Sequence, residues 1–248
     1  MNNIIIISPV RSGSTWLNLV LKHHLNLYNF GETFCTISPK LSFDGFLNEY
    51  RFFHSDHFNE VVRDHWPMRK LPSKEITKSI SEKQPYIIKI TPWDLYDAQE
   101  TNESDITNFD FFELYEKTKP TIIFLYRKNL VEHFLSFNAV HQTGIMNADS
   151  PFMNYQRPKF KFTEKELQYW QAHKEHWEMC YRDYGNLFDH IITYEELFNL
   201  DELCGVPLKQ YNEQFTLKLN NYTKEEKEEC KQKTGIKDNY ELFDCISR

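Results

Sequence analysis

Residues 3–17 read Asn-Ile-Ile-Ile-Ile-Ser-Pro-Val-Arg-Ser-Gly-Ser-Thr-Trp-Leu, and this stretch predicts the fold of the chain. Ile4 to Ile7 are all β-branched, which is typical of a strand buried on both faces of a parallel sheet. Pro9 ends the strand because it has no N–H to donate. From Thr15 the apolar residues recur at helical spacing. A strand, a loop of small residues and a helix N-terminus direct free backbone N–H groups at one point, so we predict an anion site there.

The alternation of strand and helix continues along the chain. Apolar runs predict strands, and residues spaced three or four apart predict the helices between them. The expected strands cover 27–30, 85–90, 120–126 and 188–194, and the expected helices include 111–117, a helix from 130, a long helix opened by a capping box at 163–166, and a charged helix at 222–234. This order predicts an α/β fold of three layers, a central parallel sheet with helices on both faces, in a single domain over residues 1–248.

Composition restricts the function classes. A net charge of −7 argues against a nucleic-acid-binding surface. The 5 cysteines are scattered and form no C-x-x-C pair, which favours a reducing compartment and argues against a zinc site. No apolar run approaches the roughly 18 residues of a membrane span, and the N-terminus lacks the pattern of a signal peptide. We therefore expect a cytoplasmic protein with no membrane span.

The loop at residues 9–16 differs from the P-loop of nucleoside triphosphatases. That motif places a Lys before its last hydroxyl residue, whereas the cation here is Arg11, before Gly13. The order P-x-R-S-G-S-T-W resembles the phosphosulfate-binding loop of sulfotransferases that use 3′-phosphoadenosine 5′-phosphosulfate (PAPS). The resemblance implies that Arg11 grips the phosphosulfate and that Trp16 packs on the adenine. It also implies a cradle of backbone and hydroxyl groups formed by Ser12, Gly13, Ser14 and Thr15.

A second anion site is expected after the strand at 120–126. Arg127 ends this strand, and Ser136 follows nine positions later on the next helix. Bacterial sulfotransferases hold the 3′-phosphate of the cofactor with an Arg and a Ser at this spacing, so the resemblance gives Arg127 and Ser136 that role. The guanidinium fork suits phosphate. Taken alone, the segment also fits an arginine that caps a strand and a serine buried in a helix.

The catalytic base departs from the pattern of cytosolic sulfotransferases. Lys89-Ile90-Thr91-Pro92 is similar to the K-T-H-P element of cytosolic sulfotransferases, but the catalytic His is absent. The resemblance keeps Lys89 as a catalytic cation and transfers the role of base to Glu32, in a Gly-Glu-x-Phe element that bacterial members often carry. A solvated loop acid is an equally good interpretation of Glu32.

Three further segments have weaker interpretations. Residues 35–84 are rich in aromatic residues and histidines and are expected to shape the acceptor pocket; the spacing of their histidines and acids matches no standard metal site. Residues 194–197, Tyr-Glu-Glu-Leu, resemble a marker of the sulfotransferase fold. The R-K-G element that binds the 3′-phosphate near the end of cytosolic members is missing, and Lys218, Lys224 and Lys233 are candidate substitutes.

Together the motifs imply a P-loop-like sulfotransferase fold and transfer of a sulfuryl group from PAPS to an acceptor hydroxyl, without a metal ion. A small-molecule or glycan acceptor is expected, with a carbohydrate or glycolipid preferred. Two alternatives stay open: a small-molecule kinase or other nucleotide-binding enzyme with a P-loop-like fold, and a non-catalytic binding module.

Overall fold

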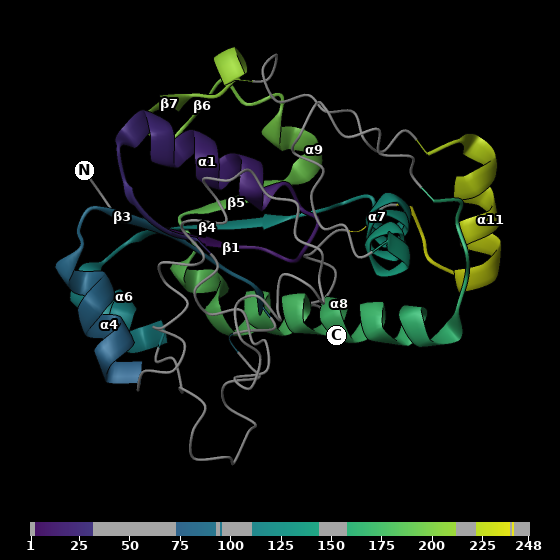
Figure 1. The fold of residues 1–248 in the computed structure, drawn as a ribbon, viewed down its shortest axis with the longest axis horizontal. Helices are drawn as coiled ribbons and strands as arrows, with labels where there is room; N and C mark the ends of the chain where they lie inside the picture. The colour runs from purple at the N-terminus through teal and green to yellow at the C-terminus, as the bar shows by residue number, and fades with distance from the viewer. Residues whose placement is uncertain are drawn as a thin grey trace.

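The computed structural model describes residues 3–31, 73–92, 95, 111–143, 158–211, 222–238 and 240. Its centre is a parallel sheet of 5 strands in the order β2-β3-β1-β4-β5. The strands are β1 (Ile4–Ile7), β2 (Tyr28–Gly31), β3 (Tyr86–Ile90), β4 (Thr121–Tyr126) and β5 (His190–Thr193). Figure 1 shows helices on both sides of this sheet. The expected α/β architecture with a parallel central sheet is confirmed.

The first strand lies in the middle of the sheet. Strand β1 pairs in parallel with β3 on one side and with β4 on the other. Its four isoleucines are at most 1% exposed. Because neighbouring strands cover both edges of β1 and helices cover both faces, every position favours an apolar β-branched side chain.

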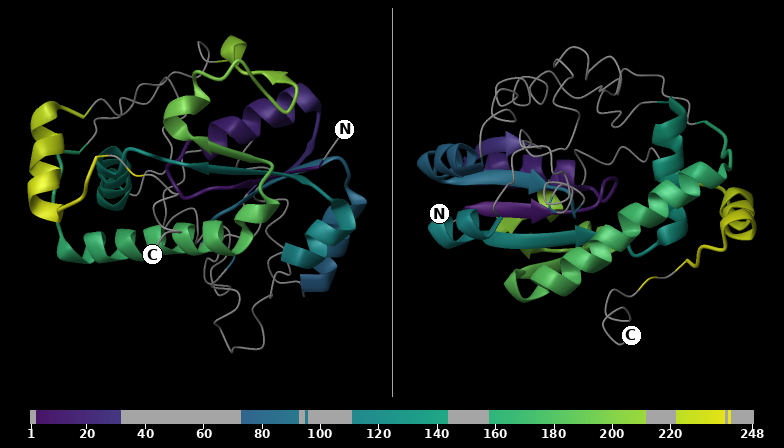
Figure 2. Two further views of the ribbon diagram at one scale, coloured as in Figure 1. Left: turned by 180° about the vertical axis from the view of Figure 1, so that it is seen from behind. Right: turned by 90° about the horizontal axis from the view of Figure 1, so that it is seen from below.

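Two apolar cores flank the sheet. Ile4 and Ile6 pack with helix α1 (Ser14–Leu25), helix α9 (Tyr194–Leu197) and the hairpin of β6 (Glu202–Leu203) and β7 (Val206–Pro207). Ile5 and Ile7 pack with the opposite layer. That layer contains α4 (Ser73–Glu82), α6 (Phe111–Thr118), α7 (Leu130–Thr143) and α8 (Glu164–Tyr184). Figure 2 shows the two layers from behind and from below.

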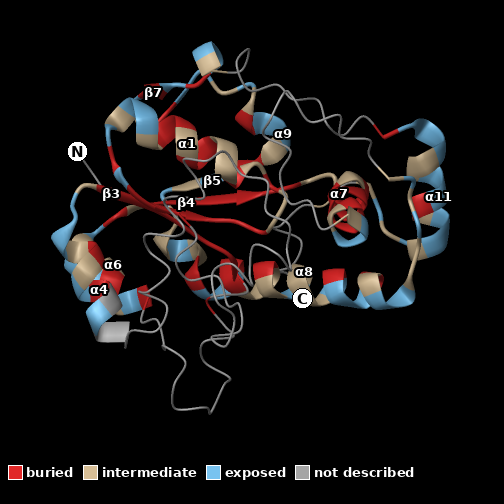
Figure 3. Cartoon of the chain, in the orientation of Figure 1, coloured by how far each residue is buried: buried red, intermediate tan, exposed pale blue. Residues whose placement is uncertain are grey.

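Helix α8, the long helix expected after residue 163, buries one apolar and aromatic stripe. Leu167, Trp170, Trp177, Tyr181 and Tyr184 are buried, and Figure 3 shows the helix with its buried side turned toward the sheet. Turn η2 (Gly185–Leu187) follows it, and helix α11 (Lys224–Thr234) packs against α7. None of the helices within the described ranges is long and apolar enough to cross a membrane.

Strand β5 differs from its prediction. The apolar run at 188–194 indicated a buried strand, but β5 begins at His190 and lies at the edge of the sheet. Its Ile191 side chain is 37% exposed. An edge strand pairs on one side only, and a run of apolar residues does not show how many neighbours a strand has.

The capping box predicted at 163–166 forms only in part. Thr163 Oγ1 accepts from Glu166 N–H at 3.2 Å, as expected for an N-cap. In the described chain the Glu166 carboxylate does not return this bond and instead accepts from Asn138 Nδ2 at 2.6 Å. Complete boxes form at Thr193 with Glu196 and at Thr223 with Glu226. The sequence pattern predicted the N-cap at Thr163 correctly, but Asn138, which is distant in sequence, binds the Glu166 carboxylate in place of the Thr163 N–H.

Asn3 joins three elements at the amino edge of the sheet. Its Nδ2 donates to Gln84 Oε1 at 3.1 Å and to the Thr118 carbonyl at 3.2 Å, and its Oδ1 accepts from Tyr86 N–H at 3.1 Å. The side chain is 5% exposed. One amide therefore connects the starts of β1 and β3 to the end of α6.

We predict that Asn3→Ala lowers the free energy of unfolding by about 2–3 kcal/mol, because it leaves buried donors and acceptors without partners. Ligand binding at the opposite, carboxyl end of the strands should not change. Urea unfolding measures the first quantity and calorimetry the second. A loss below about 0.5 kcal/mol would show that water replaces these bonds.

Candidate functional site

The loop between β1 and α1 has the backbone of an anion-binding turn. Arg11 and Gly13 both have positive φ, at 66° and 81°. The first intrahelical bond of α1 runs from Leu17 N–H to the Gly13 carbonyl at 3.1 Å. The N–H groups of Ser14, Thr15 and Trp16 precede this bond, so they have no partner within the helix and lie at the positive end of its dipole.

The structure brings the predicted residues of this loop close to two neighbouring strand ends. Arg11 Nε donates to Ser136 Oγ at 3.0 Å, which joins the loop to α7. On the other side Lys89 Nζ donates to Thr15 Oγ1 at 3.4 Å. Lys89 and Ser136 are 6% and 1% exposed. The carboxyl ends of β3 and β1 and the helix that follows β4 therefore meet at this loop.

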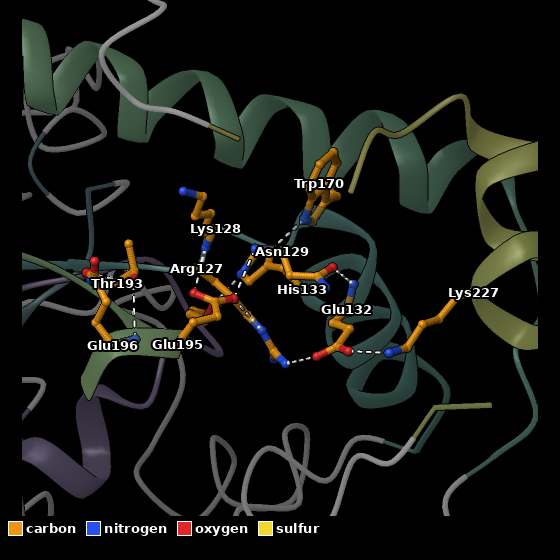
Figure 4. Close-up of polar contacts among 11 residues, drawn as sticks. Arg127, Lys128, Asn129, Glu132, His133, Trp170, Thr193, Glu195, Glu196 and Lys227 are labelled. Atoms are coloured by element: carbon orange, nitrogen blue, oxygen red, sulfur yellow. Dashed lines mark hydrogen bonds and ion pairs between the residues drawn. The ribbon is translucent and has the colours of Figure 1, made fainter. Parts of the chain in front are cut away.

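Arg127 is buried at the end of β4, next to β1, and is surrounded by acidic and aromatic groups. Its guanidinium is 4% exposed and donates to Glu132 Oε2 at 2.9 Å. Glu195 Oε1 lies 3.9 Å from Arg127 Nε. The guanidinium carbon lies 4.5 Å from the centre of the Tyr194 ring, within the range of a cation–π interaction. Figure 4 shows these acids converging on Arg127.

Tyr194 and Glu195 are site residues that the sequence analysis assigned only to a fold marker. A Cβ on Gly13 would lie 2.8 Å from Tyr194 Cδ2, so the Tyr194 ring contacts both the Gly13 turn and Arg127. The Glu195 carboxylate accepts from the N–H groups of Lys128 and Asn129 at 3.0 and 2.9 Å. Helix α9 therefore positions both the loop at Gly13 and the turn after β4.

A lysine of α11 reaches this cluster. Lys227 Nζ pairs with Glu132 Oε1, while Glu132 Oε2 accepts from Arg127. Lys227 was not among the three lysines proposed as substitutes. Of those, Lys218 lies outside the described residues, Lys224 is exposed, and Lys233 pairs with Glu229 on the same helix.

Two buried polar atoms at the loop, Ser12 Oγ and Trp16 Nε1, lack a hydrogen-bond partner among the described residues. Arg127 Nε, at the end of β4, also lacks a hydrogen bond, although Glu195 lies 3.9 Å from it. Buried polar groups are normally satisfied, so unsatisfied ones at the loop indicate a site for an acceptor-rich ligand. The Trp16 ring packs against Phe198 of the segment after α9, at 5.2 Å between centroids.

Two predicted features cannot be placed. Glu32, the candidate base, lies outside the described residues, immediately after the end of β2 at Gly31. Most of the 35–84 segment, including its histidines, lies outside them too. Among the residues that are described, no group of three or more His, Cys, Asp or Glu side chains is placed to hold a metal ion.

Comparison with known proteins gives no further indication of family. No protein-family model matches the chain, and no curated protein matches it.

Gly13 and Gly205 provide a matched pair for testing the loop. Both have positive φ, at 81° and 78°, but only Gly13 has a neighbour that an added Cβ would strike; Gly205 has nothing within 4 Å. We predict that Gly205→Ala lowers the free energy of unfolding by about 1–2 kcal/mol, from backbone strain alone. Gly13→Ala should lower it by a further 1–3 kcal/mol or so, because Tyr194 must move. Equal losses in urea unfolding would show that the Tyr194 contact is not tight.

Proposed function

We propose that the protein is a sulfotransferase that moves a sulfuryl group from PAPS to an acceptor hydroxyl. The observation that carries the proposal is that two sites, each with an arginine, lie on adjacent strand ends: the Arg11 loop after β1 and Arg127 after β4. Arg11 Nε donates to Ser136 Oγ at 3.0 Å, which fixes the first site to the helix that follows Arg127. A ligand with anionic groups at both ends of an adenosine suits such a pair.

Sheet topology supports a ligand at this place. In the strand order, β2 lies toward one edge of the sheet from β1, and β5 lies toward the other edge from β4. The connections that leave β1 and β4 therefore run in opposite directions. Open α/β sheets bind ligands at the carboxyl ends of strands where the connections diverge in this way. The P-loop-like sulfotransferase fold is part of the proposal, because a parallel sheet of this kind occurs in many unrelated families.

The residues present fit the proposed cosubstrate. The free N–H groups that open α1 and the orphaned Ser12 hydroxyl would hold the 5′-phosphosulfate, and Trp16 would lie against the adenine. Arg127 and Ser136 would hold the 3′-phosphate. When bound, the cosubstrate supplies a sulfuryl group on a good phosphate leaving group.

A phosphate at Arg127 would compete with Glu132, which now occupies one arm of the guanidinium. Two carboxylates beside a phosphate would repel it at a site with little solvent. Lys227 offsets this repulsion because it forms an ion pair with Glu132. It can still neutralise that carboxylate when the phosphate replaces it at the Arg127 guanidinium. The arginine would then meet the phosphate through its fork.

The chemistry proposed for the site is in-line transfer, in which negative charge builds on the equatorial and leaving oxygens. Arg11, Lys89 and the N–H groups of the loop would stabilise that charge. A base must also take the proton of the acceptor hydroxyl. Strand β2 ends at Gly31, the residue before Glu32 in the sequence, and the carboxyl ends of β2 and of β3, which carries Lys89, share one edge of the parallel sheet; this supports Glu32 as the proposed base.

The cofactor test is calorimetry with adenosine 3′,5′-bisphosphate, adenosine 5′-phosphate and ATP. We predict that the bisphosphate binds best, with the same affinity whether or not a chelator is present. Arg127→Lys keeps the charge but loses the fork, so it should weaken bisphosphate binding by about 1–3 kcal/mol and leave binding of the monophosphate almost unchanged.

Arg182→Lys is the matched control, because Arg182 is exposed on α8 and pairs with Asp183 away from the loop. It should change neither affinity. Tighter binding of ATP than of the bisphosphate would contradict the proposal, and an equal loss for both adenosine ligands in Arg127→Lys would limit Arg127 to a structural role.

The base is tested separately. We predict that Glu32→Gln binds the bisphosphate normally and loses at least about a hundredfold in turnover, because a positioned general base contributes roughly 10²–10⁴-fold. Turnover is measured with a screened alcohol or sugar acceptor, or by slow hydrolysis of PAPS. If Glu32→Gln keeps near-normal turnover while His54→Gln or His57→Gln is inactive, the base lies in the 35–84 segment instead.

A further inference from the structure

His133 is a buried titratable residue for which the proposed function has no use. It lies on α7, one turn before Ser136, and its side chain is fully buried. Its Nε2 lies 2.8 Å from the Val10 carbonyl oxygen, and its Nδ1 accepts from Trp170 Nε1 at 2.7 Å. Figure 4 shows the indole nitrogen of Trp170 directed at the His133 ring.

These two partners determine the tautomer. The indole N–H of Trp170 can only donate, so Nδ1 must carry a lone pair. The Val10 carbonyl can only accept, so Nε2 must carry the proton. Only the neutral Nε2–H imidazole satisfies both bonds, and a second proton would break the bond with Trp170.

The surroundings hold the ring in this neutral form. The pKa of His133 is lowered to about 3, mainly by burial and also by the charges of Arg127, Arg11 and the nearby His173, although the Val10 hydrogen bond opposes the shift. The ring therefore stays neutral at physiological pH. With both nitrogens engaged and a pKa this low, His133 is not suited to act as a general base.

The bond to Val10 acts on the anion loop. The Val10 carbonyl belongs to the same peptide unit as the Arg11 N–H, and the two groups of a trans peptide point in opposite directions. Fixing the carbonyl against α7 therefore directs the Arg11 N–H away from α7 and sets the start of the turn. Arg11 is a non-glycine residue with φ of 66°, a conformation that persists only when its surroundings hold it.

We propose that His133 is a positioning residue for the Arg11–Thr15 loop: its Nε2–H orders the turn through the Val10 carbonyl, and Trp170 orients the ring by donating to Nδ1. Helix α7 then holds the loop at two points, by the main chain through His133 and by the Arg11 side chain through Ser136. This role goes beyond the proposed function, since it does not depend on which anion the loop binds.

The first measurement is the ¹⁵N NMR spectrum of the histidine ring in the full chain without ligand. We expect a protonated Nε2 and an unprotonated Nδ1 from pH 8 to pH 5. Trp170→Phe removes the donor to Nδ1 and keeps an aromatic ring. The Val10 carbonyl still requires a proton on Nε2, so we expect the Nε2–H tautomer to persist and the Nδ1 resonance to shift because its hydrogen bond is lost. Trp177→Phe is the control, because Trp177 also packs edge-on to His133, at 4.7 Å between centroids, and should leave the spectrum unchanged.

The second measurement tests positioning. Gln can place an amide donor close to the Nε2 position, whereas Leu cannot donate. The probe is amide hydrogen exchange at Leu17, whose N–H donates to the Gly13 carbonyl and closes the turn. We expect this exchange to be about tenfold faster in His133→Leu, because one buried hydrogen bond is lost. In His133→Gln the exchange rate should stay near that of the wild type.

A ring that titrates between pH 5 and pH 8, or a wild-type Nδ1–H tautomer, would overturn the proposal. So would equal Leu17 exchange in the wild type and both His133 variants. If a His133 variant fails to fold, Trp170→Phe decides the question by the same Leu17 exchange, which should be faster than in Trp177→Phe if the orientation of the His133 ring positions the loop. Neither measurement uses a ligand, so the result is separate from that of the cofactor test.

Discussion

The site depends on the packing of the Tyr194 ring, which touches the backbone at Gly13 on one side and the Arg127 guanidinium on another. The loop after β1 and the turn after β4 both take their positions from this ring. A Cβ at position 13 would displace the Tyr194 ring. Glycine is therefore required there by the contact with Tyr194 as well as by the positive φ. The carboxylate of Glu195, the next residue, holds the turn after β4 by two backbone N–H groups.

Helix α7 provides the second set of constraints. It begins just after Arg127, carries Glu132 on its first turn, and then presents His133 and Ser136 to the loop after β1. Residues that contact both anion sites thus lie within two turns of one helix. A helix is stiff over this length, so the distance between the two sites is fixed by backbone geometry.

The sequence predicted the features that depend on local pattern. The β-branched run at Ile4 to Ile7 indicated a strand inside a parallel sheet, and the structure places it at the centre. The resemblance to sulfotransferases assigned Arg11 and Ser136 to one cofactor, and the structure joins their side chains although they are 125 positions apart. The edge position of β5 was missed, since its sequence resembles that of a buried strand.

Features that depend on distant partners could not be predicted. Lys227 and Glu132 are 95 positions apart, and neither residue has a neighbour in sequence that indicates the pair. The Glu166 side chain had a good local partner at Thr163, yet it bonds to Asn138, which comes from another helix. Glu32 lies outside the described residues, so its role remains a proposal that rests on the sequence and on the end of β2.

The ion pair from α11 has a consequence for the electrostatics of the whole cluster. Arg127 and Lys227 contribute two positive charges, and Glu132 and Glu195 contribute two negative charges, so the four groups together are neutral. Without α11 the same four-group cluster would lose Lys227, carry one net negative charge and repel anions. Helix α11 therefore removes the net negative charge around Arg127, a residue 100 positions before Lys227 in the sequence.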